Sequence, residues 1–386
     1  MPNGSVCSWA ARCECGVRSA DGGLSMTRLS ARLLPSFAAL AGALLVSAAI
    51  VVLAGHDPML AFSALASGAF GSLDSLSEVA VKSCPLLLTG LEIAIAFQAG
   101  VWNIGAEGQL LVGALAMAAL GTFGAALPAW VDLLADLALA ALSGALWAGI
   151  AGQLKLRRNV NEVISTIMLN FIALGLVGYL VQGPLMEAGG RYPQTDAILP
   201  GLWMPRFVSP HRVHAGVLIA LLIAAGMQVL LYRTVVGYEI RAVGFNPDAA
   251  RLAGIDVDRR LLLALMVSGA MAGLAGGIEV SAVTHRLYER FSPGWGFTAI
   301  AVGLLGRLTP AGVVVAAFFF GALDTGSNAM QRAAGVSSVL VAVMQATVIF
   351  FLVALERRRW WRQPRPSDDP EVASPPVDTP HHLPSA

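Results

Sequence analysis

Residues 101–118, VWNIGAEGQLLVGALAMA, are apolar enough to lie inside a membrane, yet polar side chains interrupt them. Asn103, Glu107 and Gln109 fall close together in this stretch, and an unpaired polar group is costly in hydrocarbon. Glycines at positions 100, 105 and 108 interrupt the same segment. We therefore expect a helix that is broken at membrane depth, with its polar groups paired there.

Composition extends this expectation to the whole chain. Hydrophobic residues make up 56% of the 386 residues and charged residues only 13%, which excludes an ordinary soluble domain. The sequence predicts an all-α fold, a polytopic transmembrane helical bundle of roughly ten spans with broken or re-entrant segments. The expected spans are residues 34–54, 84–100, 106–127, 131–152, 163–182, 214–232, 261–280, 296–306, 311–328 and 336–355.

Two segments do not fit a simple span. Residues 296–306 are too short to cross a membrane as an unbroken helix, so we expect half a helix or part of a re-entrant pair. Residues 58–82 carry charged side chains among small apolar ones and are interpreted as an interfacial segment on the outer side. The interrupted segments near 100–110 and 296–310 fall in comparable places in the two halves, which is typical of a midplane binding site between repeats.

The distribution of basic residues predicts the orientation. Arg28 and Arg32 precede the first span, and the loops assigned to the same side carry about twice as many basic residues as the others. Both termini are therefore expected in the cytoplasm. We divide the chain into a cytoplasmic tail at 1–33, absent if Met26 is the true start, a transmembrane domain at 34–356, and a disordered cytoplasmic tail at 357–386.

Several kinds of chemistry find no support in the sequence. A phosphate-binding loop of the form G-x-x-x-x-G-K-[ST] does not occur, so this chain is not expected to hydrolyse ATP. Histidines and cysteines lack metal-ligand spacing, and we predict no metal site, no bound cofactor and no enzymatic activity. Four cysteines, three of them in the N-terminal tail, do not form a disulfide framework.

Polar residues inside spans are the positive signal, because they default to functional roles. The candidates for a substrate pathway are Trp102, Asn103, Glu107, Gln109 and Asn170. If the segment is helical, Asn103 and Glu107 stand four residues apart and face one way. They either hold the broken helix and its neighbours in shape or contact substrate directly. Asn161 is expected to cap the helix that carries Asn170.

A short capped helix is predicted in the inner loop at 233–260. Asn246 suits the cap, Pro247 the first helical position, and Gly254 the end of the turn. Ala249 and Ala250 lie between them. Such a helix on the cytoplasmic side fits either a plug for a groove in another protein or an ordinary interfacial helix.

Three motifs together carry a family resemblance. They are NIGAEGQ from Asn103, NEVISTIMLNFIA from Asn161, and AVGFNPDAARLAGI from Ala242. The region from about residue 35 to 355 resembles the permease subunits of ABC importers of the branched-chain amino acid and simple-sugar type. More narrowly, it resembles the longer of two paired permeases in nucleoside importers of bacterial cell membranes.

The resemblance implies partners and a mechanism. Ala249, Ala250 and Gly254 match the family's coupling helix, which inserts into a groove on a separate ATPase subunit, where ATP is used. A second related permease, as a heterodimer, and an extracytoplasmic substrate-binding lipoprotein are also implied. Membrane lipids, but no nucleic acid, complete the expected partners. Nucleoside import by alternating access is then the expected function, with simple sugars or branched-chain amino acids as alternative substrates.

An ion-coupled secondary transporter is the alternative from another class. In that case Glu107, Glu279 and Asp324 would form a proton or cation relay inside the membrane.

Overall fold

The computed structural model describes residues 42, 45–123, 128–207, 211–337, 342–343, 346–347 and 350. Within them the chain is helical, and its only strand-like pairings are two isolated bridges. The helices are α2 (Pro58–Phe70), α3 (Leu73–Gln98), α4 (Ala106–Phe123), α5 (Ala129–Arg158), α6 (Glu162–Gln182), α7 (Ala215–Arg233), α8 (Val235–Phe245), α9 (Pro247–Leu252), α10 (Val257–Glu279), α11 (Trp295–Leu305) and α12 (Pro310–Ala334), with a 3-10 turn at Pro200–Leu202 and a π-helical turn at Val280–Thr284.

Seven of the described helices are long and apolar enough to cross a membrane: α3, α4, α5, α6, α7, α10 with its π-turn, and α12. The predicted multi-span helical bundle is therefore confirmed. About half of the expected first span, most of the expected last span and both tails lie outside the described residues, so the total of roughly ten spans and the cytoplasmic termini stay predictions.

Residues 58–82 are not one segment as expected, and their interfacial position on the outer side stays a prediction. Their first part is the separate 13-residue helix α2, whereas residues 73–82 form the first turns of the membrane-spanning helix α3. The charged side chains on these first turns of α3 are paired. Asp74, Glu78 and Lys82 recur every four residues along α3, and each has an oppositely charged or histidine partner on another element.

The predicted break is confirmed. Helix α3 ends at Gln98, α4 begins at Ala106, and Gly100 adopts a φ of +77° in the non-helical linker between them. The expected short segment is also confirmed, because α11 has 11 residues. At 1.5 Å per residue it measures about 16 Å, roughly half the hydrocarbon thickness of a membrane.

Glycines four residues apart, Gly269, Gly273 and Gly277, bring α10 against its neighbours. A Cβ added to Gly273 would overlap the backbone of α5 at Ala140, and one added to Gly269 would overlap Gly144. Close backbone approach of this kind lets helices associate in lipid, where packing rather than hydrophobicity drives contact.

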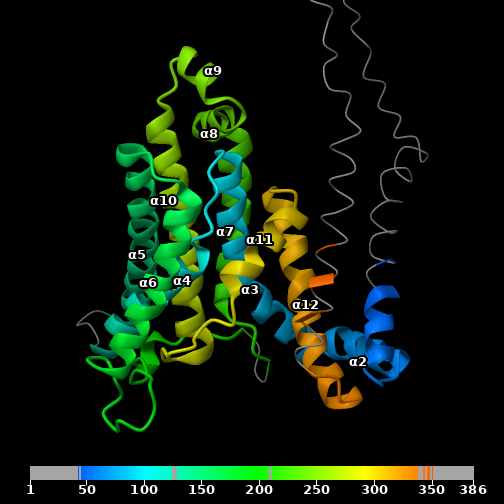
Figure 1. Ribbon diagram of the computed structural model, residues 1–386. Helices are drawn as coiled ribbons and strands as arrows, with labels where there is room; N and C mark the ends of the chain where they lie inside the picture. Colours follow the sequence, from blue (N-terminus) through cyan, green and yellow to red (C-terminus); the bar gives the residue numbers. More distant parts are fainter. Residues whose placement is uncertain are drawn as a thin grey trace, which may run out of the picture.

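Burial separates an inner helix from an outer layer. The apolar window of α3 is 89% buried, whereas those of α5, α6 and α7 are only 28–33% buried. The outer helices expose large apolar side chains such as Leu146, Phe171 and Leu222, as lipid-facing helices do. Helices α8 and α9 project from one end of this bundle, where α9 joins the start of α10 (Figure 1).

Candidate functional site

The linker between α3 and α4 is held by a buried network centred on Asn103. Its amide nitrogen lies 2.9 Å from Glu92 Oε1 in α3 and 2.8 Å from Ser268 Oγ in α10. Its amide pairs reciprocally with the amide of Gln109 in α4, at 3.1 and 3.2 Å. Asn103 is fully buried, and the network ties the linker to three helices at once.

A second contact joins the two interrupted segments. The backbone N–H of Gly296, in the first turn of α11, donates to Glu107 Oε2 at 2.8 Å. Glu107 itself lies in the first turn of α4, so one carboxylate sits beside the starts of two helices, where negative charge is favoured. Gly296 has to be glycine here, because an added Cβ would overlap the backbone of Glu107.

Asn170 connects α6 to the start of α4. Its side-chain oxygen accepts from the N–H of Gly108 at 2.8 Å, and its nitrogen donates to the carbonyl of Ile104 at 2.7 Å. The first N–H groups of a helix have no partner within the helix, and Asn170 is the partner of one of these groups in α4. Asn161 caps α6 as expected, by accepting from Val163 N at 2.9 Å.

The structure thus brings Asn103, Glu107, Gln109 and Asn170 together around the start of α4, all at most 7% exposed. Asn103 and Glu107 would face the same way only in a continuous helix, and this condition is not met, because Asn103 lies in the non-helical linker and turns toward α3 and α10. Trp102 is separate from this network. It is 57% exposed, and its ring lies 4.8 Å from that of Phe97.

The predicted inner-loop helix is α9, and its cap is as expected. Asn246 Oδ1 accepts from the N–H groups of Asp248 and Ala249, both at 3.0 Å, and Pro247 occupies the first helical position. Gly254, with a φ of +82°, follows the end of the helix. The sequence did not predict the 11-residue helix α8 that leads into α9.

The faces of α9 differ from one another. Ala250 is buried against Val243 and Val257, whereas Ala249 is exposed. Leu252 and Phe245 are 92% and 90% exposed, which makes them the most exposed large apolar side chains among the described residues. Sequence reasoning gave no role to Phe245, and the signal it missed was an apolar residue directly before a polar cap.

A row of ion pairs lies at the start of α3. Asp74 pairs with His211 at 2.7 Å, Glu78 with Arg212 at 3.2 Å, and Lys82 with Asp324 of α12 at 2.8 Å. The last pair lies within two candidate spans, α3 and α12.

The acids of the alternative relay do not form a chain. Glu107 bonds to Gly296 and Asp324 pairs with Lys82, and among the described residues no hydrogen bond joins either of them to Glu279.

Comparison with known proteins identifies the family. The family model described as "Branched-chain amino acid transport system / permease component" matches residues 75–353. The glucose ABC transporter permease protein TsgB13 of Haloferax volcanii is 39% identical over 331 residues, covering 81% of this chain and 85% of its own. The guanosine ABC transporter permease protein NupP of Bacillus subtilis is 38% identical over 330 residues, 85% of this chain and 94% of its own.

A second guanosine ABC transporter permease protein of Bacillus subtilis, NupQ, is 31% identical over 257 residues, 62% of this chain and 77% of its own. Since the matched family is a permease component and these relatives are ABC transporter permeases, the alternative of an ion-coupled secondary transporter is set aside. This chain belongs to the permease-component family of branched-chain amino acid transport systems and is a multi-pass, non-enzymatic membrane subunit of an ABC transporter.

Proposed function

We propose that this chain forms part of the translocation pathway of an ABC importer for nucleosides in a bacterial cell membrane. The names of NupP and NupQ support a nucleoside, and that of TsgB13 supports a sugar as the second candidate. A nucleoside contains a pentose, so one pathway lined by polar groups against apolar walls suits either class. Trp102 favours the nucleoside, because an exposed aromatic ring can stack on a base.

The single observation that carries the proposal is the α8–α9 projection. Phe245, the last residue of α8, and Leu252, the last residue of the capped helix α9, are both exposed at one end of a membrane bundle, and this apolar surface has the features of one that docks in a groove. We assign the surface formed by Phe245, Ala249 and Leu252 to contact with the ATPase subunit, which uses the ATP. Asn246, Pro247 and Gly254 set where this helix begins and ends, and Ala250 packs it against the rest of the chain.

A path of direct contacts leads from α9 to the broken helix. Gly244, three residues before Pro247, packs its backbone against the end of α3, so closely that an added Cβ would overlap the carbonyl oxygen of Gln98. Gly100 lies against Gly244 in turn, and Gln98 donates to the carbonyl of Leu308, just after α11. Movement of α9 on the ATPase would therefore reach both interrupted segments and rock the bundle between inward and outward states.

Within this scheme, Asn103, Glu107, Gln109 and Asn170 set the shape of the pathway, and Trp102 contacts substrate. A second related permease completes the pathway as a heterodimer partner, in line with the paired names NupP and NupQ. An extracytoplasmic lipoprotein delivers the substrate, and both termini lie in the cytoplasm.

The test is uptake of radiolabelled guanosine and glucose by cells in which the intact chain, or a variant, replaces the native copy. We expect guanosine uptake, reduced at least about fivefold by Trp102→Ala and largely retained by Trp102→Phe, because stacking on a base contributes about 1–3 kcal/mol. Trp130→Ala is the control, since Trp130 is 68% exposed at the start of α5. Glucose uptake without guanosine uptake would refute the nucleoside assignment, and uptake of neither would refute both.

A further inference from the structure

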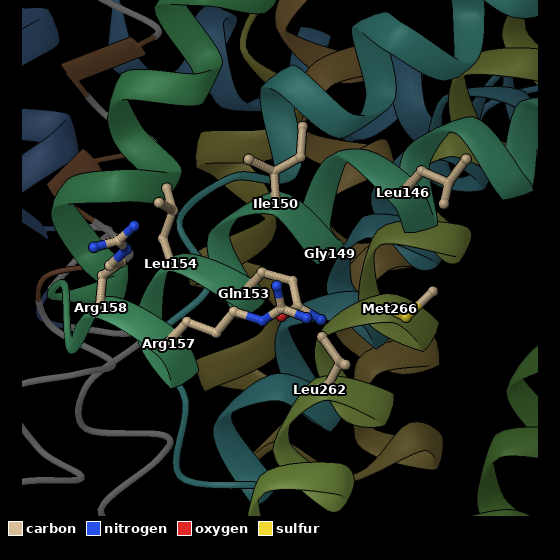
Figure 2. Close-up of a pocket in the computed structure, with 9 residues that line it drawn as sticks. All are labelled: Leu146, Gly149, Ile150, Gln153, Leu154, Arg157, Arg158, Leu262 and Met266. Carbon is tan, nitrogen blue, oxygen red and sulfur yellow. The ribbon is translucent and has the colours of Figure 1, made fainter.

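A groove of about 540 Å³ runs along the outer surface between α5 and α10. Its long walls are apolar, with Leu146 and Ile150 from α5 and Leu262 and Met266 from α10. Its lining becomes polar at one end, where Arg157 and Arg158 close α5. Figure 2 shows the side chain of Arg157 extending toward Leu262, with Arg158 at one end of the groove and Leu146 at the other.

Gly149 keeps the floor of the groove open. A Cβ added at this position would meet a single neighbour, Met266 Cγ, at 3.7 Å, which is an ordinary contact. The space beside Gly149 is therefore not filled by close helix packing, in contrast to Gly144 one turn earlier, where the backbone of α10 is in direct contact.

The length of α5 places the two ends of the groove at different depths. Its 30 residues measure about 45 Å, against a hydrocarbon core of about 30 Å, so part of the helix extends beyond the core, and its basic last turn is a part that favours the head-group region. Arg157 and Arg158 are the final two residues of the helix. Leu146 lies eleven positions earlier, about 16 Å deeper, at the level of acyl chains.

The two arginines have no anionic partner among the described residues. Their neighbour Lys155 is paired with Glu162 at 2.8 Å, which uses the nearest acid, and both arginines are exposed. Two unpaired guanidinium groups at head-group depth favour a phosphate, which arginine binds through paired hydrogen bonds.

We propose that this groove binds one anionic phospholipid of the cytoplasmic leaflet. Its phosphate bonds to Arg157 and Arg158, and one acyl chain lies against Leu146, Ile150 and Met266. The choice of leaflet rests on the proposed orientation, in which α9 faces the ATPase, because α10 begins five residues after α9 ends and brings Leu262 to the same end of the molecule. A basic pocket between membrane helices is a recurrent form of lipid head-group site.

The test is native mass spectrometry of the purified full-length permease, titrated in detergent with dioleoyl phosphatidylglycerol or dioleoyl phosphatidylcholine. We expect tighter retention of one phosphatidylglycerol. Substituting both arginines (R157Q/R158Q) should weaken it about 30-fold, which corresponds to about 2 kcal/mol at about 1 kcal/mol per arginine. The matched control is R233Q/R251Q, which removes two exposed arginines from the same end of the molecule but outside the groove.

A second variant tests the apolar part. Gly149→Leu should fill the groove and weaken retention of phosphatidylglycerol, while inorganic phosphate at millimolar concentration should not displace the lipid. Equal retention of the two lipids by the intact chain would overturn the proposal, as would an equal loss in R233Q/R251Q. Displacement by phosphate would also overturn it, because the site would then be one for a free anion. None of these measurements involves nucleoside transport, so failure here leaves the proposed function intact.

Discussion

Replacing Phe245 and Leu252 together by alanine is expected to weaken binding of the ATPase subunit without destabilising the permease. The two side chains are 90% and 92% exposed, so their truncation removes almost no contact within the chain. Ala250 is the contrasting position. It is 4% exposed and packs on Val243 and Val257, so substitution there would disturb α9 itself and would not isolate the interface.

The magnitude follows from the exposed area. Burying a side chain of this size is worth about 1.5–3 kcal/mol, so two that become buried on docking contribute about 3–6 kcal/mol. Even the lower value corresponds to a rise of about 150-fold in Kd. The assay is titration of the permease, reconstituted in nanodiscs, with fluorescently labelled ATPase subunit.

The matched control is V235A/Y238A, which truncates two apolar side chains of α8 that are 72% and 62% exposed. We expect this control to bind the ATPase within about threefold of the unmodified chain. The reasoning is refuted if F245A/L252A also binds within threefold, or if the two double variants lose equal affinity. In either case Phe245 and Leu252 would not form the surface that contacts the ATPase subunit.

Three further predictions concern the interior. Asn103→Leu should lower the thermal unfolding temperature of the purified chain markedly, because it leaves several buried polar groups unpaired at about 1–3 kcal/mol each; an unchanged temperature would contradict the network. Gly244→Ala should retain ATPase binding but abolish uptake, because the new Cβ would overlap the carbonyl oxygen of Gln98; normal uptake would exclude this route of coupling. Lys82→Met should reduce the amount of folded chain in membranes, because it leaves Asp324 unpaired, and the double variant K82M/D324L should restore that amount. If the double variant does not restore it, the ion pair has no structural role.

The break after α3 could be predicted from sequence because its cause is local. Glycine and polar side chains within an apolar stretch conflict with an unbroken membrane helix, and the chain resolves the conflict between Gln98 and Ala106. The partners of Asn103 could not be predicted in the same way. Ser268 is 165 residues away, and an isolated serine in a span carries no sign of which helix it will contact.

Helix α8 and the first turns of α3, which were not predicted as helix, both contain charged residues whose partners are distant in sequence. Helix α8 carries Glu239 and Arg241 and was taken as loop, but Glu239 pairs with Arg260 of α10 and Arg241 lies over the ring of Tyr232. Residues 73–82 were predicted to be interfacial because of their charged side chains, and one of these, Lys82, pairs with Asp324 of α12. Charged residues in a sequence segment therefore overstate how polar the folded helix is, because some of these charges are paired with residues of other helices.

The same contacts explain why a break in α3–α4 suits a protein that must respond to a remote subunit. An unbroken helix could not bend where it passes the end of α8. Gly100, at a φ of +77°, lets the chain turn there, against Gly244. Beyond that turn the linker is not loose, because Asn103 holds it to α3 and α10 and Asn170 holds it to α6. We infer that displacement of α8 moves the linker and the start of α4 as one body. Because Gly296 bonds to Glu107, the start of α11 would move with them.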